Sequence, residues 1–433
     1  MTADDDSVIY VISDLHVGGD EQLGEIEFRD ELLSFLKRLE NTDENVELVI
    51  NGDAFGLWEL TNAEGIEKFD HLEETYPALF EQFRATGEAI DITLIPGNHD
   101  HELAAYPAYV ERFAEYNIDL VREQAIDRQM DEHIVHFEHG HQQDPNNRIE
   151  NWGDPYARPL GYYYNTHVTS RAGRLSERGR FNWLKDVQAV TPTERIPVWL
   201  LSKYVYREMH PLLRYALVPF LLLFNISALL AVLAGLDVLG VWELPISQTR
   251  TFLRSFGLAG SAAFLLLMIN VVVAGLLVLV AVPLYFIRRD IRHTLDRFGV
   301  METPLTVDPE SPYEARAQEL FDDGVDVYCH GHTHRAGIQR LDGGLLVNSG
   351  TWLKRLHRRD GVIGLLPPVF VPSYQLFAVR IAPNGDRLAV EFEAIEKPSP
   401  SPDELTLTER FLTLGRQPQP TMPERATIPQ ESD

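Results

Sequence analysis

The sequence predicts an α/β fold into which an apolar helical hairpin is inserted. Three observations predict it: 45% of the 433 residues are hydrophobic, short apolar runs alternate with longer helical patterns, and two long uncharged runs lie near the middle of the chain. This composition excludes a disordered or collagen-like chain. The formal net charge of −27, from 38 Lys and Arg against 65 Asp and Glu, excludes a basic nucleic-acid-binding module.

The predicted strands are six short apolar runs outside the central hairpin. Each is four to eight residues long or slightly shorter and rich in Val, Ile, Leu, Phe or Tyr, as buried strands are. The runs cover residues 8–12, 46–50, 92–95, 133–137, 325–328 and 345–347.

The hairpin is predicted from two runs without a charged residue, 22 residues at 215–236 and 33 residues at 255–287. At 1.5 Å per residue the first run is about 33 Å long as a helix, enough for a hydrocarbon core of about 30 Å. More basic residues lie on the outer flanks of the hairpin than in its connector. Both chain ends are therefore expected in the cytoplasm, and the protein in the cell membrane. The alternative is a pair of buried soluble helices.

The expected organisation has a catalytic domain in two parts, residues 1–157 and 306–396, with the hairpin at 215–287 between them. Residues 158–214 carry ten basic and four acidic side chains, which favours a juxtamembrane surface facing anionic lipid headgroups, the alternative being a solvated helical face. Residues 288–305 form a second juxtamembrane connector. Residues 397–433 are expected to be a flexible tail, with a short helix near 404–414.

The surface composition favours a halophilic source, because an acidic surface with only six Lys stays hydrated in concentrated salt. The alternative is an ordinary acidic protein with Arg-rich codon usage. Cys329 is the single cysteine and excludes an intrachain disulfide, which fits a reducing compartment.

Side chains able to bind metal follow almost every predicted strand. Ligands in α/β proteins gather beyond the carboxyl ends of the strands, so these clusters can converge although they lie far apart in sequence. Asp, Asn and His together suit Mn²⁺, Fe or Zn²⁺ rather than Ca²⁺. The clusters are Asp14-Leu15-His16, Gly52-Asp53, Gly97-Asn98-His99-Asp100, His139-Gly140-His141 and Gly331-His332-Thr333-His334.

In these five motifs, in this order, the sequence resembles the calcineurin-like metallophosphoesterase superfamily. The resemblance implies a four-layer fold, with a β-sandwich of two sheets flanked by helices, and a centre of two divalent metal ions. Mn²⁺ is the first choice, with Fe and Zn²⁺ as alternatives. One ion would bind Asp14, His16, Asp53 and His334, and the other Asp53, Asn98, His139 and His332, with Asp53 as the bridge.

The resemblance also implies that His99 is catalytic and not a metal ligand. Two neighbouring cations supply a nucleophile and neutralise charge on the phosphoryl oxygens, while His99 would protonate the leaving oxygen or stabilise the phosphate. Asp100 is expected to orient His99 and raise its pKa. His141 is kept as an alternative ligand to His139, and His101 is expected either behind the ligands or at the surface.

The segments Gly52-Asp53-Ala54-Phe55-Gly56-Leu57-Trp58 and Gly331-His332-Thr333-His334-Arg335 are similar to those of the UDP-2,3-diacylglucosamine pyrophosphatases. The sequence departs from that branch at His99, where Arg is common, and in the added hairpin. Arg335 either contacts substrate phosphate or pairs with a surface carboxylate.

The predicted function is hydrolysis of a phosphodiester or pyrophosphate bond by a membrane-bound enzyme, with a lipid-linked or nucleotide-linked substrate and membrane lipids as partners. The alternative keeps the chemistry and makes the hairpin only an anchor, with soluble nucleotides, phosphoproteins or nucleic acid as substrate. The net charge argues against nucleic acid. The sequence does not indicate an oligomeric state.

Overall fold

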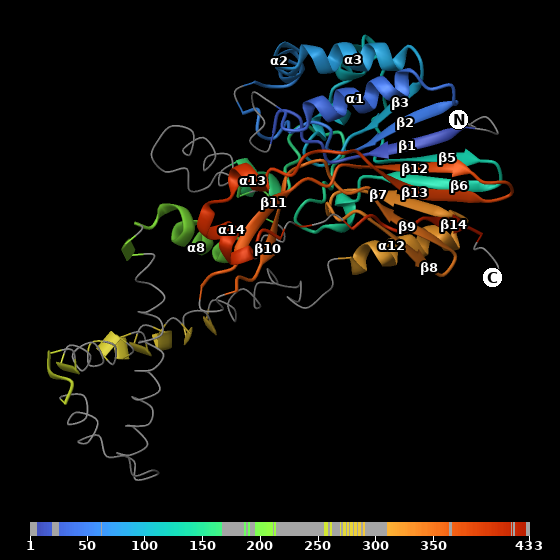
Figure 1. The fold of residues 1–433 in the computed structure, drawn as a ribbon. Helices are drawn as coiled ribbons and strands as arrows, with labels where there is room; N and C mark the ends of the chain where they lie inside the picture. The colour runs from blue at the N-terminus through green and yellow to red at the C-terminus, as the bar shows by residue number, and fades with distance from the viewer. Residues whose placement is uncertain are drawn as a thin grey trace. The chain divides into compact units, whose positions relative to one another are not determined.

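The computed structural model of the chain describes residues 7–19, 26–61, 63–166, 186–187, 189–190, 195–210, 310–362, 366–416, 418 and 421–429, with short stretches between 212 and 290 (Figure 1). The chain divides into two compact units. The first comprises residues 1–202, 309–360 and 368–433, and the second residues 203–308 and 361–367. The predicted metal-binding motifs all belong to the first unit.

The first unit contains a seven-stranded sheet in the order β14-β13-β12-β1-β2-β3-β4. The strands β1 to β4 are mutually parallel, and β12 joins the sheet antiparallel to β1, with Ile9 opposite Ile381. Their bounds are β1 Val8–Ile12, β2 Val46–Asn51, β3 Asp91–Ile95, β4 Asp119–Leu120, β12 Phe377–Pro383, β13 Leu388–Ala394 and β14 Ala426–Ile428.

A second sheet of five strands has the order β5-β6-β7-β9-β8. The strands β6, β7 and β9 are parallel, while β5 and β8 are antiparallel edges. Their bounds are β5 Ala125–Met130, β6 His133–Glu138, β7 Val327–His330, β8 Gly337–Leu341 and β9 Gly344–Asn348. All six strands predicted from apolar runs are present, within two residues at each end.

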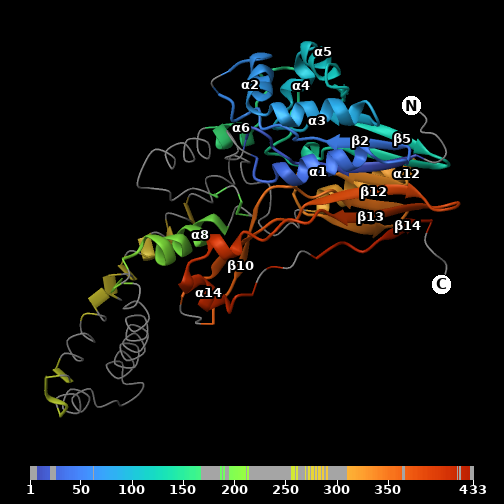
Figure 2. The same cartoon turned by 45° about the horizontal axis from the view of Figure 1, so that its top comes forward.

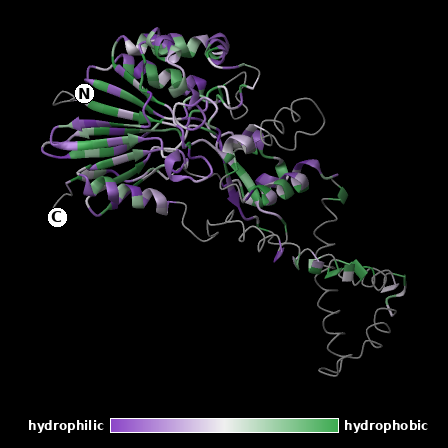
Figure 3. Ribbon diagram, turned by 180° about the vertical axis from the view of Figure 1, so that it is seen from behind, coloured by the Kyte–Doolittle hydropathy of each residue, from purple (hydrophilic) through white to green (hydrophobic). Residues whose placement is uncertain are grey.

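The two sheets pack face to face. One buried cluster joins Val11 and Val49 of the first sheet to Phe137, Cys329 and Val347 of the second. Because successive side chains of a strand point to opposite faces, the alternate residues of β1, Tyr10 and Ile12, lie in a separate cluster on the outer face. Hydrophobic residues run along the strands of both sheets (Figure 3).

Helices cover both outer faces of the sandwich (Figure 1; Figure 2 shows the helices over the first sheet from another side). The outer cluster of the first sheet takes buried side chains from α1 Arg29–Glu40, α2 Glu67–Thr75, α3 Pro77–Gly87, α4 Glu102–Ala105 and α5 Ala108–Ala114. The second sheet is covered by α12 Ser311–Asp322 through Ala317, Leu320 and Phe321. The predicted α/β class with a central sandwich and flanking helices is therefore confirmed.

A small two-stranded sheet of β10 Arg355–Arg359 and β11 Val369–Ser373 adds to the first unit. Leu356 of β10 forms a bridge with Val190 and packs with Trp199 of α8 Ile196–Lys203. The apolar runs outside the hairpin did not predict this sheet.

The tail beyond residue 397 is more ordered than expected. Helix α14 Leu407–Thr413 lies within the predicted 404–414 segment and begins with a capping box between Thr406 and Glu409. Strand β14 then pairs with β13 and buries Ile428 in the core between the sheets. This corrects the expectation of a flexible tail, since local composition could not show that a short apolar segment completes a sheet edge.

The first hairpin run, residues 215–236, lies outside the described residues, and the second is described only in short pieces. Within the described part of the chain, no helix has both the length and the apolar character needed to span a bilayer.

Candidate metal centre

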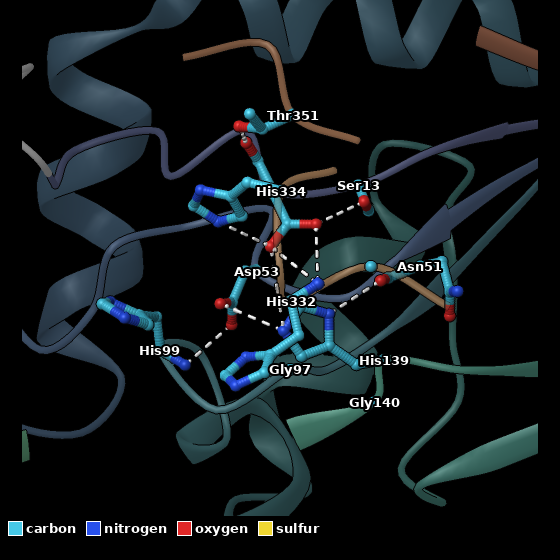
Figure 4. A network of polar contacts seen from close by, with 12 residues as sticks. Ser13, Asn51, Asp53, Gly97, His99, His139, Gly140, His332, His334 and Thr351 are labelled. Atoms are coloured by element: carbon cyan, nitrogen blue, oxygen red, sulfur yellow. Dashed lines mark hydrogen bonds and ion pairs between the residues drawn. The ribbon is translucent and has the colours of Figure 1, made fainter. Parts of the chain in front are cut away.

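The predicted metal-binding residues lie where strands of both sheets end, and Figure 4 shows Asp53, His139, His332 and His334 close together there. Asp14 and His16 follow β1, Asp53 follows β2, Asn98 and His99 follow β3, His139 follows β6, and His332 and His334 follow β7. Parallel strands direct their carboxyl ends to the same edge, and the packing of the two sheets brings both sets of ends together.

Three groups of these residues have ligand atoms within 4.8 Å of one another: Asp14, His16 and His334; His16, Asp53 and His99; and Asp53, His139 and His332. The closest approaches are 3.0 Å from His334 Nε2 to Asp14 Oδ1 and 3.1 Å from His139 Nε2 to Asp53 Oδ2. Asp53 belongs to two groups, as expected of a bridging carboxylate.

Asn98 completes the predicted set from a buried position. Neither its Oδ1 nor its Nδ2 has a hydrogen-bond partner within the described part of the chain. Buried amide groups without a partner are costly, so Asn98 fits a side chain whose oxygen binds a cation. Mixed carboxylate, imidazole and amide donors suit divalent transition metals. The residues present therefore fit divalent metal ions.

The backbone at the site is unusual. Five of the seven predicted ligands have a positive φ, with values from 48° at His16 to 64° at His332. The five are Asp14, His16, Asp53, His332 and His334. Left-handed conformations are uncommon for residues other than Gly and concentrate at functional sites, where the surrounding fold maintains them.

Two glycines leave space for the ligands. A Cβ atom on Gly97 would lie 2.3 Å from Asp53 Oδ1, and one on Gly52 would lie 2.3 Å from His139 Nδ1. Gly52 also has a φ of +85°, a conformation that glycine adopts readily. The glycines of these motifs are therefore required by the close approach of ligand side chains to the backbone.

The buried charges at the site stabilise one another. Burial raises the pKa of Asp14, but His334 and His139 outweigh it and bring the pKa to about 2. Asp53 behaves likewise, with its pKa held well below the usual value by His139 and His99. Burial lowers the pKa of His139, but Asp53 and Asp14 raise it to about 9. The carboxylates therefore stay ionised and attract positive charge.

A hydrogen bond to the backbone fixes the orientation of His139. Its Nδ1 lies 3.0 Å from the carbonyl oxygen of Asn51, so Nδ1–H donates to that carbonyl and Nε2 faces Asp53. A hydrogen bond of this kind selects the tautomer of a metal-binding histidine. The alternative ligand His141 is not in any of the three groups. It is fully buried and stacks on Trp152 with ring centroids 5.3 Å apart.

The ring of His99 lies between an aromatic face and a carboxylate. It stacks on Trp58 at 4.1 Å between centroids, and its Nδ1 is 3.6 Å from Glu59 Oε1. Burial lowers the pKa of His99, but Asp53 and Glu59 outweigh it, and the pKa is raised overall. Phe55, Leu57 and Trp58 are buried in the core.

Asp100 does not have the predicted contact with His99. Its Oδ1 accepts a hydrogen bond from the Gly97 amide at 2.6 Å, and its Oδ2 accepts one from the Phe55 amide at 3.1 Å. Burial raises the pKa of Asp100 to about 7. The expectation that Asp100 orients His99 is thus corrected. Asp100 instead ties the loop after β3 to the loop after β2, and Glu59 is the carboxylate beside the imidazole.

Some residues of the site were not predicted. Asp144 Oδ2 lies 3.1 Å from His332 Nε2, and the Thr351 hydroxyl donates to the Asp14 carbonyl at 2.8 Å. Glu59 could have been noticed because it directly follows the Gly-Asp-x-Phe-x-x-Trp segment, whereas no pattern in the sequence marked Asp144. His101, predicted either behind the ligands or at the surface, is buried. Its Nδ1 lies 3.2 Å from the Asn98 carbonyl.

Comparison with known proteins agrees with this geometry. A model of the family described as calcineurin-like phosphoesterase matches residues 7–218, which include the first four of the five motifs. No curated protein matches the chain.

Several solved structures resemble the chain at low identity. A dimetal phosphatase from Danio rerio has a TM-score of 0.34 and 10% identity, over 91% of this chain and 98% of the other. A protein from Staphylococcus aureus named as a 5′-nucleotidase has a TM-score of 0.31 and 11% identity, over 95% of this chain and 58% of the other. An uncharacterized protein from Streptococcus pneumoniae described as a predicted phosphoesterase has a TM-score of 0.28 and 10% identity, over 90% of this chain and 91% of the other.

The family match and the convergence of ligand side chains at one edge of the sandwich lead to the same conclusion. Residues 7–218 match the calcineurin-like phosphoesterase family, and the chain is a metal-dependent phosphoester hydrolase.

Proposed function

We propose that this centre hydrolyses a phosphodiester or pyrophosphate bond in a lipid-linked or nucleotide-linked substrate. The observation that carries the proposal is that Asp53 takes part in two adjacent groups of ligand atoms, with His99 beside it. Two divalent cations bound there would supply an activated nucleophile and neutralise charge on the phosphoryl oxygens. Asp14, His16, Asp53 and His334 would hold one cation, and Asp53, Asn98, His139 and His332 the other.

The protein side chains contribute orientation and a proton. The His99 amide donates to Asp53 Oδ1 at 2.7 Å, which connects the backbone at His99 to the shared carboxylate. Trp58 and Glu59 hold the ring. His99 would donate its proton to the leaving oxygen, and the rise in its pKa shifts the ring toward the protonated form that this role needs.

We also propose that residues 215–287 anchor the enzyme in the cell membrane as a hairpin of two helices, with the catalytic unit and both chain ends in the cytoplasm. The two uncharged runs support this. Described apolar side chains of the second run also support it, since Leu258 and Leu279 are 92% and 68% exposed. One active site built from residues on both sides of the hairpin requires an even number of crossings.

The test is a hydrolysis screen with detergent-solubilised full-length protein at molar salt, stripped of metal and then supplied with Mn²⁺, Fe²⁺ or Zn²⁺. The substrates are bis(p-nitrophenyl) phosphate, p-nitrophenyl phosphate and nucleotide-diphosphate lipids. We expect metal-dependent turnover with preference for the lipid substrates. Activity on the small diesters alone would reduce the hairpin to an anchor, and no turnover with bound metal would contradict the proposed function. Release of the protein from membranes by alkaline carbonate would contradict the hairpin.

A further inference from the structure

Strand β10 presents a row of basic side chains on one face. Successive residues of a strand alternate between its faces, so Arg355, His357 and Arg359 share one face while Leu356 and Arg358 share the other. The buried Leu356 packs against Val190 and Phe370. The face of β10 that carries Leu356 is therefore turned toward this small core. The basic row lies on the opposite face.

The row begins next to the metal centre. A guanidinium Nη1 of Arg355 donates to the backbone carbonyl of His334, and the side chain of His334 in turn lies 3.0 Å from Asp14. Arg355 is half-buried. A guanidinium has five N–H donors, and the contact with His334 is the one hydrogen bond that the Arg355 side chain makes within the described residues.

Within the described part of the chain, none of the three side chains of the row has a carboxylate partner. The contrast with their neighbours is sharp: Lys354 is within 3.4 Å of Asp186, Glu27 and Glu404, and Arg358 is 3.0 Å from Asp360. In a chain with 65 carboxylates against 38 cationic side chains, an unpaired basic row stands out. Positive charge kept unpaired beside a reaction centre is available to an anionic ligand.

Electrostatics within the row agree with this description. Burial, Arg355 and Arg359, with a contribution from Arg195, lower the pKa of His357. Arg335 lies close enough to Arg355 for the two positive charges to interact. Arg335 itself lies 3.3 Å from Glu310, so of the two expected roles the structure has the ion pair. The positive charges of Arg335 and Arg355 repel each other, and a bound anion would relieve the repulsion.

We infer that Arg355, His357 and Arg359 form a subsite for a second phosphate group of the substrate, next to the phosphoryl group that reacts at the metal centre. The inference rests on the proposed function and narrows its substrate class to molecules that carry at least two phosphate groups. Arg355 to Arg359 spans about 13 Å along the strand, so the row can follow an extended anion. Guanidinium groups suit it because they bind phosphate through two parallel hydrogen bonds.

The experiment compares full-length wild type with R359Q and R355K, and uses R358Q as the matched control on the opposite face. Each variant is assayed with Mn²⁺ on ADP-ribose, which has two phosphates, and on bis(p-nitrophenyl) phosphate, which has one. We expect the ratio of kcat/KM for the two substrates to fall about tenfold in R359Q, mainly through KM, as loss of one charge-assisted hydrogen bond predicts. R355K should lower the ratio as well, because Lys retains the charge but not the fork. R358Q should leave it unchanged.

A second readout does not depend on turnover. Calorimetric binding of α,β-methylene-ADP should weaken about tenfold in R359Q and stay as in wild type in R358Q. Co-sedimentation with phosphatidylglycerol vesicles distinguishes a lipid headgroup: if R359Q loses vesicle binding but keeps the wild-type substrate ratio, the subsite inference is wrong. An equal fall with both substrates, or no fall, also overturns it. If neither the wild type nor any variant hydrolysed bis(p-nitrophenyl) phosphate, that result would instead contradict the proposed function.

Discussion

Replacing Gly97 by Ala tests whether the close approach of backbone and ligand is required for metal binding. A Cβ at this position would lie 2.3 Å from Asp53 Oδ1 and 2.6 Å from the Asp53 amide nitrogen, whereas ordinary contacts begin near 3.4 Å. The Asp53 carboxylate must therefore move by about 1 Å, in a densely packed interior that resists such shifts. Gly97 does not have a positive φ, so the alanine backbone itself is not strained.

A displacement of about 1 Å at a shared ligand should lower turnover by about 10²-fold. It should also weaken binding of both metals, because Asp53 lies in two of the ligand groups. The assay combines metal content by elemental analysis, turnover of bis(p-nitrophenyl) phosphate, and thermal unfolding. Gly337→Ala is the control, since its Cβ would meet only the Arg335 carbonyl at 3.7 Å. Wild-type metal content and turnover in Gly97→Ala would refute the steric reasoning.

Three further changes test residues around the centre. His99→Ala should keep its metals and slow turnover by about 10²–10⁴-fold; loss of metal would show that His99 is a ligand, as its place in one ligand group allows. Glu59→Gln preserves the side-chain shape beside Gly19 and Gly56 but removes the charge 3.6 Å from His99. It should slow hydrolysis of phenyl esters about tenfold and of p-nitrophenyl esters less, because a good leaving group needs less protonation; equal effects would count against the role. Burial lowers the pKa of His136, but Glu138 and Asp127 outweigh it and raise the pKa above 6.5. Its ion pairs therefore stabilise the fold fully below pH 6.5 and are lost as pH rises through the raised pKa. His136→Gln should cost about 1 kcal/mol at pH 5.5 and less at pH 9 by thermal unfolding, and a cost independent of pH would contradict this.

The local sequence was informative where one strand and the turn after it contain the whole signal. The runs at 8–12 and 46–50 are buried on both sides of the sheet, so they are continuously apolar and were predicted almost to the residue. The polar clusters that follow them were predicted for the same reason. The strand β14 was missed because it is three residues long and its pairing with β13 joins segments more than 30 residues apart.

Contacts between side chains from different loops could not be predicted from the sequence. Asp100 follows His99 directly, yet its carboxylate bonds the amides of Gly97 and Phe55, while Glu59 from another loop lies beside the His99 ring. Likewise, nothing in the order Arg355, Leu356, His357 showed which face of β10 would keep unpaired charge, because that depends on where the carboxylates of other segments lie.

The sequence by itself determined the fold class, the order of the metal-binding motifs and the reaction class, because these depend on residue types at fixed short spacings. Only the tertiary structure decided which side chains meet. It placed Glu59 rather than Asp100 beside His99, placed Asp144 beside His332, and left the basic row on β10 without carboxylate partners among the described residues. The physical reason is that such contacts join residues far apart in the chain, whose distances are set by how the two sheets and their loops pack.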